Sequence, residues 1–186
     1  MRNDVGQNGG PLADDEAYGG RRDPRFVTIR RGGSLDDDTH RLLALWAADC
    51  AEAVLSLFTA AHPHDDRPRA AIEGARAWAR GEITMTQARE LAYAAHDAAK
   101  SSAGPAREAA RAAGHAVATA HMADHELGAA AYGIRAVRAA ASTDERDRAG
   151  LEECARQREQ LPDSIRGLVI SDEVRRNTKF WSLFSC

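Results

Sequence analysis

The strongest constraint on the fold comes from residues 111–135, a segment with the period of a helix but without a charged face. At about 3.6 residues per turn, one side carries an ordinary apolar stripe and another is mostly alanine, glycine and methionine, with Glu126 as its one charge. A helix without a solvated side is normally surrounded by other helices. We therefore expect a central helix whose imidazoles and phenol point inward. The inward stripe comprises Gly114, His121, His125, Gly128, Tyr132 and Arg135.

Alanine content and helix-start signals predict an all-α protein. Hydrophobic residues make up 44% of the chain, and alanine, which has the highest helix propensity, supplies an unusual share of them. The expected fold is a single-domain bundle of about six or seven helices around an Ala-rich central helix. N-caps or capping boxes are indicated at Ser34, at Asp65 or Asp66, at Thr84 with Gln87, and at Ser142 with Glu145. The expected helices span 34–60, 67–80, 84–100, 106–141, 142–160 and a short segment from 161, and the fourth is either one helix or two helices split near 122–124.

Length and charge favour one domain with few kinds of partner. We expect a helical domain at 26–186 after a flexible N-terminal arm at 1–25, which is rich in Gly, Asp and Arg. The net charge of −3 gives no footprint for a nucleic acid. No run approaches the ~20 apolar residues of a membrane span, and the N-terminus has no export signal. A cytoplasmic protein without nucleic-acid or membrane partners is expected.

The cysteines and the C-terminal tail give two further expectations. Cys50, Cys154 and Cys186 are odd in number and widely spaced, which argues against a disulfide framework. Cys50 lies on an apolar helix face, where it is expected to be an inert small hydrophobe. The tail at 180–184 is too apolar to hang in water, so it is expected to dock on the body.

The inward stripe supplies the candidate catalytic residues. His121 and His125 are four residues apart and share a helix face, and Tyr132 follows on the same stripe. His115 and Arg111 also share a face, from which they could reach the same cavity. Inward titratable groups are costly unless they are hydrogen-bonded or used to move protons. The alternatives are histidines satisfied by core hydrogen bonds, and an Arg111 that pairs with a carboxylate such as Asp49 or Glu52.

Residues on the other helices could complete this site. His96, Trp46 and Trp78 could wall the same cavity, although tryptophan at helical spacing is more often part of a core. Arg67 and Arg69 could bind an anion, although an ion pair that tethers two helices is the commoner use of such residues.

No cofactor or metal is expected. His121 and His125 could hold zinc together with Asp124 or Glu126, but the motif is not HExxH and a further ligand would have to be supplied. The chain has no Gly-rich phosphate loop after a strand, no GxSxG elbow and no Cys–His–Asn signature. Chemistry that side-chain proton transfer alone can perform remains.

The chain resembles the immunity protein family of bacterial polymorphic toxin systems, an all-α family. The segments that carry the resemblance include RRGGSLDDDTHRLLALWAADCAEAVL, DDRPRAAIEGARAWARGEI, ARELAYAAHDAA, REAARAAGHAVATAHMADHELGAAAYGIRA and LPDSIRGLVI, which cover nearly everything after Phe26. The resemblance implies a protein that binds and blocks a cognate toxin. Members of the family often have histidine where this chain has Ala53.

Two hypotheses follow. The main one is a cofactor-independent enzyme on this helical fold, a lyase, cyclase or isomerase such as those of bacterial secondary metabolism. It would use His/Tyr acid–base catalysis for dehydration, conjugate addition, cyclisation or isomerisation of a small molecule. The alternative is an immunity protein that neutralises a toxin by binding it. A deep pocket containing His121, His125 and Tyr132 would favour the enzyme, and a solid core with an exposed apolar patch would favour immunity. A homodimer is compatible with either.

Overall fold

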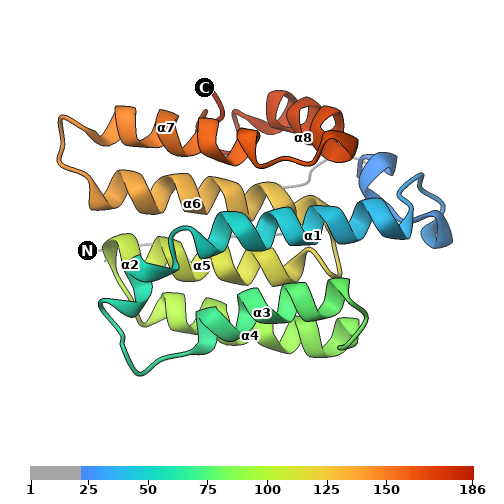
Figure 1. Cartoon of the computed structure of the whole chain (residues 1–186), viewed down its shortest axis with the longest axis horizontal. Helices are drawn as coiled ribbons and strands as arrows, with labels where there is room; N and C mark the ends of the chain where they lie inside the picture. Colours follow the sequence, from blue (N-terminus) through green and yellow to red (C-terminus); the bar gives the residue numbers. More distant parts are fainter. Residues whose placement is uncertain (1–21) are drawn as a thin grey trace, which may run out of the picture.

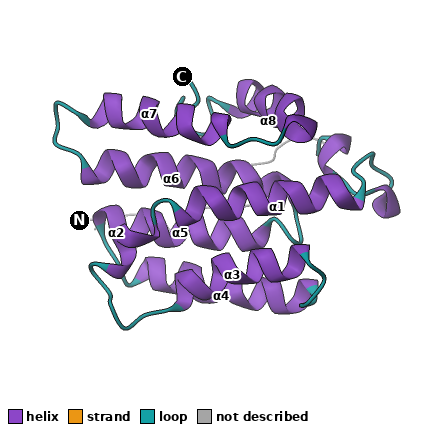
Figure 2. Ribbon diagram, viewed as in Figure 1, coloured by secondary structure: helices purple, strands orange, loops and turns teal. Residues whose placement is uncertain are grey.

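The computed structural model describes residues 22–186, which form eight α-helices and no β-strand (Figures 1 and 2). The prediction of an all-α fold is confirmed, and the predicted number of helices is slightly too low. The α-helices are α1 (Asp37–Glu52), α2 (Leu55–Thr59), α3 (Arg67–Ala79), α4 (Met85–Lys100), α5 (Gly104–Ala118), α6 (Glu126–Ala140), α7 (Arg146–Glu159) and α8 (Asp163–Arg176). The 3-10 turns are η2 (Pro24–Phe26), η3 (Ile29–Arg31) and η4 (Ala123–His125).

The first predicted helix is interrupted, which corrects its expected end near residue 60. The Val54 backbone N–H donates to the Ala51 carbonyl in a tight turn, and α2 begins directly afterwards. Val54 in the turn and Leu55 at the start of α2 are both buried.

The helix caps agree with the sequence at one start and differ at others. Thr84 and Gln87 form the predicted capping box of α4. The cap of α1 is Asp36, which accepts the Thr39 backbone N–H, rather than Ser34. The Ser34 N–H donates instead to the Pro24 carbonyl, so Ser34 belongs to the turn before the helix. Helix α7 also begins later than predicted, at residue 146.

The 106–141 segment is two helices, α5 and α6, joined by a turn that contains η4. Two hydrogen bonds around Thr119 favour the break: the Thr119 hydroxyl donates to the His115 carbonyl, and the Thr119 carbonyl lies 2.7 Å from His40 Nε2 of α1. Helix α5 packs against α1, α2, α3, α4 and α6, which confirms the segment as the central element. The two helices run antiparallel (Figure 1), so their polar stripes face one another.

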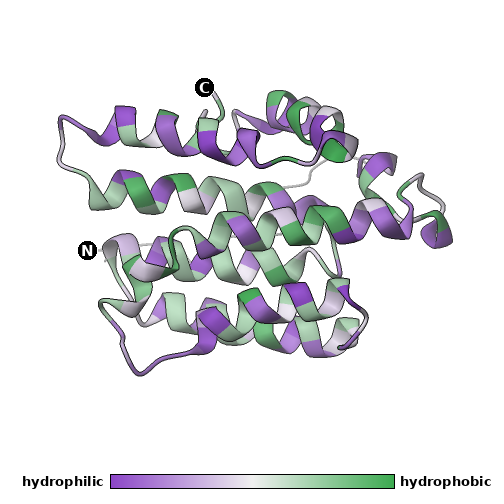
Figure 3. Cartoon of the chain, viewed as in Figure 1, coloured by the Kyte–Doolittle hydropathy of each residue, from purple (hydrophilic) through white to green (hydrophobic). Residues whose placement is uncertain are grey.

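The interior of the described residues divides into two clusters. Alanine dominates the cluster between α1, α2, α3, α4 and α5, where small side chains allow the helices to approach closely. Larger side chains fill the cluster between α1, α6, α7 and α8. Figure 3 shows hydrophilic residues prominent along α3 and α7. The single-domain organisation stays a prediction.

The predicted N-terminal arm falls mostly outside the described residues, because residues 1–21 are not described. Residues 22–25 contact the body: Arg22 pairs with Asp124 at 3.4 Å, and Arg25 donates to Ser171 of α8. A buried arginine, Arg176 of α8, donates to the Asp124 carbonyl and pairs with Glu126 at the start of α6. These contacts fix α8 and the N-terminal segment against the turn between α5 and α6.

The C-terminal tail docks on the body, as predicted, but a disulfide also holds it. Phe184 is buried, and its N–H donates to Asn177 Oδ1. Cys154 of α7 is bonded to Cys186, a disulfide that the odd number and wide spacing of the cysteines did not predict. Cys50 is free and buried. Disulfides persist mainly in oxidising compartments, and the cytoplasmic location stays a prediction.

Among residues 22–186, no helix combines the length and the apolar character that crossing a bilayer requires.

Candidate functional site

The structure brings the predicted histidines and tyrosine together in one imidazole cluster, formed by His96, His115, His121, His125 and Tyr132. The rings of His96, His115, His125 and His121 follow one another in this order, and the centroids of each neighbouring pair lie 5.2 Å apart. Tyr132 stacks on His115 with centroids 5.1 Å apart. The rings come from α4, α5, α6, η4 and the turn between α5 and η4, so the antiparallel pairing of α5 and α6, with α4 beside them, assembles the cluster.

Two glycines of the predicted stripe make room for these rings. A Cβ atom on Gly114 would lie 2.6 Å from Cε1 of His96, and one on Gly128 would lie 2.5 Å from Nδ1 of His115. Any side chain at either position would collide with an imidazole. The helices therefore approach closely enough to pack ring against backbone only because both positions are glycine.

Burial favours the neutral form of two imidazoles in the cluster, those of His115 and His121. Burial lowers the pKa of His115 well below its usual value, and the neighbouring His125 and His96 add to the shift. Burial also lowers the pKa of His121 to about 4, again with a contribution from His125. The Nδ1 atoms of His115 and His125 lie 3.1 Å apart, a distance at which one ring donates and the other accepts. A pair of this kind suits proton transfer between two neutral rings.

The rings are less buried than the sequence predicts. His121 and His125 are both partly exposed, so the expectation that they lie deep in the interior holds only in part. The segment 111–135 is central, but its polar stripe lies towards one edge of the contact between α5 and α6. The sequence pattern shows that a face lacks charges, and it does not show how far neighbouring helices cover that face.

Arginines border the cluster on one side. The Arg111 guanidinium lies 5.6 Å from the centre of the Tyr132 ring, and Arg135 lies at the same distance from it. The carboxylates proposed as alternative partners of Arg111, Asp49 and Glu52, pair instead with Arg76. Asp49 and Glu52 are therefore not the partners of Arg111.

Two tryptophans that the sequence places together lie apart. Trp46 is buried in the bulkier core cluster, and its indole N–H donates to the Gln157 carbonyl at 2.9 Å. It therefore does not wall the imidazole cluster, because the docking of α7 covers it. Trp78 packs against His40 with centroids 4.7 Å apart and lines a cavity that His121 also borders.

Arg67 and Arg69 form local ion pairs rather than bonds between helices. Arg67 pairs with Asp65 at 2.6 Å, and Arg69 lies 3.9 Å from Asp66. All four residues belong to the start of α3 and the loop before it. The tethering role weighed for these arginines is therefore wrong, because their carboxylate partners are only two or three residues away.

The cavities on the surface of the described residues include three near the candidate site residues. One of 310 Å³ is lined by His121, Trp78 and His40, and an adjoining one of 210 Å³ shares the last two. The third, of 550 Å³, lies beside the cluster and is lined by Arg135 and Trp181, among others. His125 and Tyr132 line none of these three cavities. None of the three is therefore the deep pocket that the enzyme hypothesis anticipates.

The sequence missed two features around the site. Glu108 is buried and pairs with Arg135 at 2.7 Å, which joins α5 to α6. Trp181 of the tail lies against Arg135, whose guanidinium is 4.2 Å from the indole centre. The exposed apolar tail was a signal for docking, but nothing in the sequence indicated which residue it would contact. Among residues 22–186, no group of three His, Cys, Asp or Glu side chains could hold a metal ion, and the absence of a metal stays a prediction.

Comparison with known proteins gives one match. Residues 33–164 match the model of a protein family described as "Imm-5 like putative immunity protein". The matched segment runs from the turn before α1 into the start of α8 and includes the whole imidazole cluster. No curated protein and no solved structure matches the chain.

Proposed function

The chain belongs to the Imm-5 like putative immunity protein family, and from this premise we propose that it is an immunity protein that binds a cognate protein toxin and blocks it. The observation that carries the proposal is the family match over residues 33–164, most of the chain. The proposal reverses the order of the two hypotheses drawn from the sequence, in which the enzyme came first.

Features of the surface support a binding function. Large apolar side chains are exposed on separate elements, among them Tyr93 of α4, Val174 of α8 and Trp181 of the tail. Exposed aromatic anchors beside charged residues are typical of protein interfaces. An immunity protein needs such a surface and has no need of a substrate cavity.

The test is protection. The gene should be expressed in bacteria together with a candidate toxin gene taken from its genomic neighbourhood, called the neighbouring toxin below. Cells should grow when the gene is present and stop growing when it is absent. Size-exclusion chromatography of the purified pair, with an inactivated toxin domain, should give a complex and report its stoichiometry, including any homodimer. Growth arrest despite expression of folded protein, with no complex, would contradict the proposal.

A second candidate function, the cofactor-free enzyme, is favoured by one observation, the contact between His115 and His125 beside Tyr132. In this proposal the imidazole of His115, His121 or His125 accepts a proton from the substrate. Tyr132 donates a proton to the developing oxygen, and Arg111 stabilises negative charge. His96 and Trp78 would contact a small-molecule substrate.

The enzyme proposal has its own test. His125→Ala and Tyr132→Phe should lower turnover of the pathway intermediate indicated by the gene neighbours by roughly 10²–10⁴ if these groups transfer protons. The melting temperature of each variant serves as the control for folding. Folded variants with full activity would exclude these residues as the acid–base groups.

A further inference from the structure

We infer that the cognate toxin binds through an acidic segment in the arginine groove, the 550 Å³ cavity between α5, the end of α6, the start of α7 and the C-terminal tail. The inference rests on the proposed immunity function and names the surface that performs it. The argument uses six of the lining residues: Arg107, Glu108, Arg135, Arg138, Arg146 and Trp181.

The groove concentrates positive charge on a chain whose net charge is −3. Glu108 neutralises part of it through its contacts with Arg107 at 3.2 Å and Arg135 at 2.7 Å. Arg138 pairs with Asp147 at 2.8 Å. Four arginines thus face two carboxylates, and the excess of positive charge favours an acidic partner.

Arg146 is the arginine with the most freedom to bind such a partner. Its side chain is exposed, and within residues 22–186 it forms no ion pair or hydrogen bond. It is the first residue of α7, where positive charge is unfavourable because the helix dipole already places partial positive charge at that end. A partner carboxylate would pair with the unpaired guanidinium and offset the unfavourable charge at the helix end. It could bind the planar guanidinium with two hydrogen bonds.

Trp181 supplies an aromatic anchor at the edge of the same groove. Its side chain is 50% exposed, and its backbone has a φ of 56°, which is uncommon for a residue other than glycine. Strained backbone of this kind persists where surrounding contacts hold it, and it is frequent at binding sites. Here Arg135 stacks on the indole, and the disulfide at Cys186 restrains the tail.

The anchor is therefore held in place before any partner arrives. A fixed aromatic ring loses little conformational entropy on binding, so its contact contributes more to affinity than that of a mobile side chain. Tryptophan and arginine are also the residues most often found at the energetic centre of protein interfaces. Charge and aromatic surface together fit a segment in which Asp or Glu flanks an apolar residue.

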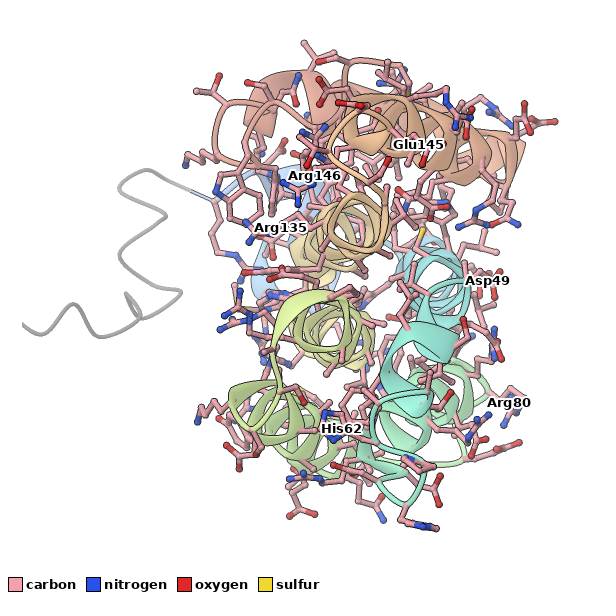
Figure 4. The ribbon with its side chains drawn as sticks, turned by 90° about the vertical axis from the view of Figure 1, so that its left-hand side faces the viewer. Asp49, His62, Arg80, Arg135, Glu145 and Arg146 are labelled. Atoms are coloured by element: carbon pink, nitrogen blue, oxygen red, sulfur yellow. A yellow bond between two sulfur atoms is a disulfide. The ribbon has the colours of Figure 1, made fainter. Side chains whose placement is uncertain are left out.

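Figure 4 shows Arg135 and Arg146 near one another on one flank of the molecule, and Asp49 and Arg80 on the opposite flank. Arg80 is exposed, ends α3 and pairs with Glu82. Reversing its charge changes the net charge of the protein as much as reversing Arg146 does, so Arg80→Glu is a matched control for long-range electrostatics.

The experiment titrates the inactivated domain of the neighbouring toxin into the full chain by calorimetry. We expect Arg146→Glu and Trp181→Ala each to weaken binding by about tenfold or more. Arg80→Glu should change the affinity by less than about threefold, as an exposed charge outside an interface does.

Arg146→Glu places a carboxylate at a helix N-terminus, so the melting temperature of this variant should not fall. Raised salt should weaken binding to the wild type more than to Arg146→Glu.

Three results would overturn the inference, and they differ in what they say of immunity. If the wild type does not bind the toxin, the proposed function fails and the inference fails with it. If the wild type binds and the groove variants bind equally well, immunity stands and the toxin contacts another face. If Arg80→Glu weakens binding as much as Arg146→Glu, the effect is one of overall charge and not of the groove.

Discussion

Gly114 and Gly128 occupy the most demanding positions of the imidazole cluster, because each backbone touches a histidine ring. The sequence placed both on the polar stripe, but glycine within a helix usually lowers stability, and no pattern shows that a ring will occupy the space. The stripe itself was predictable because it follows from helical period alone. The sequence could not predict that Trp46 lies away from the stripe, because the docking of α7 is what buries this side chain.

We predict that Gly128→Ala destabilises the protein by about 1–3 kcal/mol, because the new methyl group collides with His115. Gly167→Ala is the matched control, because Gly167 lies in α8 with open space around it. This variant should raise the free energy of unfolding by about 0.5–1 kcal/mol. Urea unfolding measures the free energy of unfolding of both variants. In the double variant Gly128→Ala with His115→Ala, part of the loss should be recovered, and no recovery would show that the ring is not the obstacle.

The lowered pKa values of His115 and His121 predict a loss of stability in mild acid. The pKa of His121 falls from the usual 6.5 to about 4 on folding, and burial lowers that of His115 well below its usual value. Between pH 6.5 and pH 4 the unfolded chain binds more protons than the folded chain. The free energy of unfolding therefore decreases as the pH is lowered from 6.5 towards 4. The raised pKa of the buried Glu126 acts in the opposite direction, since there the folded chain binds more protons.

Variants separate these contributions. Urea unfolding of His115→Gln and His121→Gln at a series of pH values should show a smaller decrease over this range than the wild type. Asp36 has a lowered pKa, owing to its bonds with Thr39, so its contribution is lost only below about pH 4. An unchanged slope in both variants would mean that the imidazoles are already accessible to protons in the folded state.

At the scale of elements, hydrogen bonds and packing decided what periodicity left open. The stripe continues through residues 118–126, so its period could not distinguish one helix from two. The hydrogen bond between the Thr119 carbonyl and His40, 79 positions away in the chain, favours two helices. The capping box at Thr84 was predictable because all its bonds are local. The disulfide was not, because it depends on the tail folding back over α7.

The Cys154–Cys186 bond should contribute measurably to stability. It joins positions 32 residues apart, and loop entropy predicts a contribution on the order of 3–4 kcal/mol for a loop of that length. Cys186→Ser, or reduction of the wild type, should lower the free energy of unfolding in urea accordingly. Cys50→Ala retains the bond and should keep its response to the reductant. Equal stability with and without reductant would show that the docked tail needs no bond.

At the scale of the whole molecule, the fold class was predictable because alanine content, caps and periodicity agree over most of the chain. Function was less predictable, because inward histidines suit both a catalytic cluster and a packed contact between helices. The structure shows these histidines packed ring against backbone at Gly114 and Gly128, and it places Trp181 and Arg146 at the edge of an open groove. This arrangement fits a protein that acts through its surface.

Binding and catalysis differ in stoichiometry, and the most direct test of the account uses that difference. The activity of the neighbouring toxin should be measured in vitro while the purified full chain is added. We predict that inhibition is complete near one chain per toxin, and that His125→Ala and Tyr132→Phe inhibit as well as the wild type once they are shown to be folded. Neutralisation by far less than one chain per toxin, lost in these variants, would contradict the account and show that the imidazole cluster is catalytic.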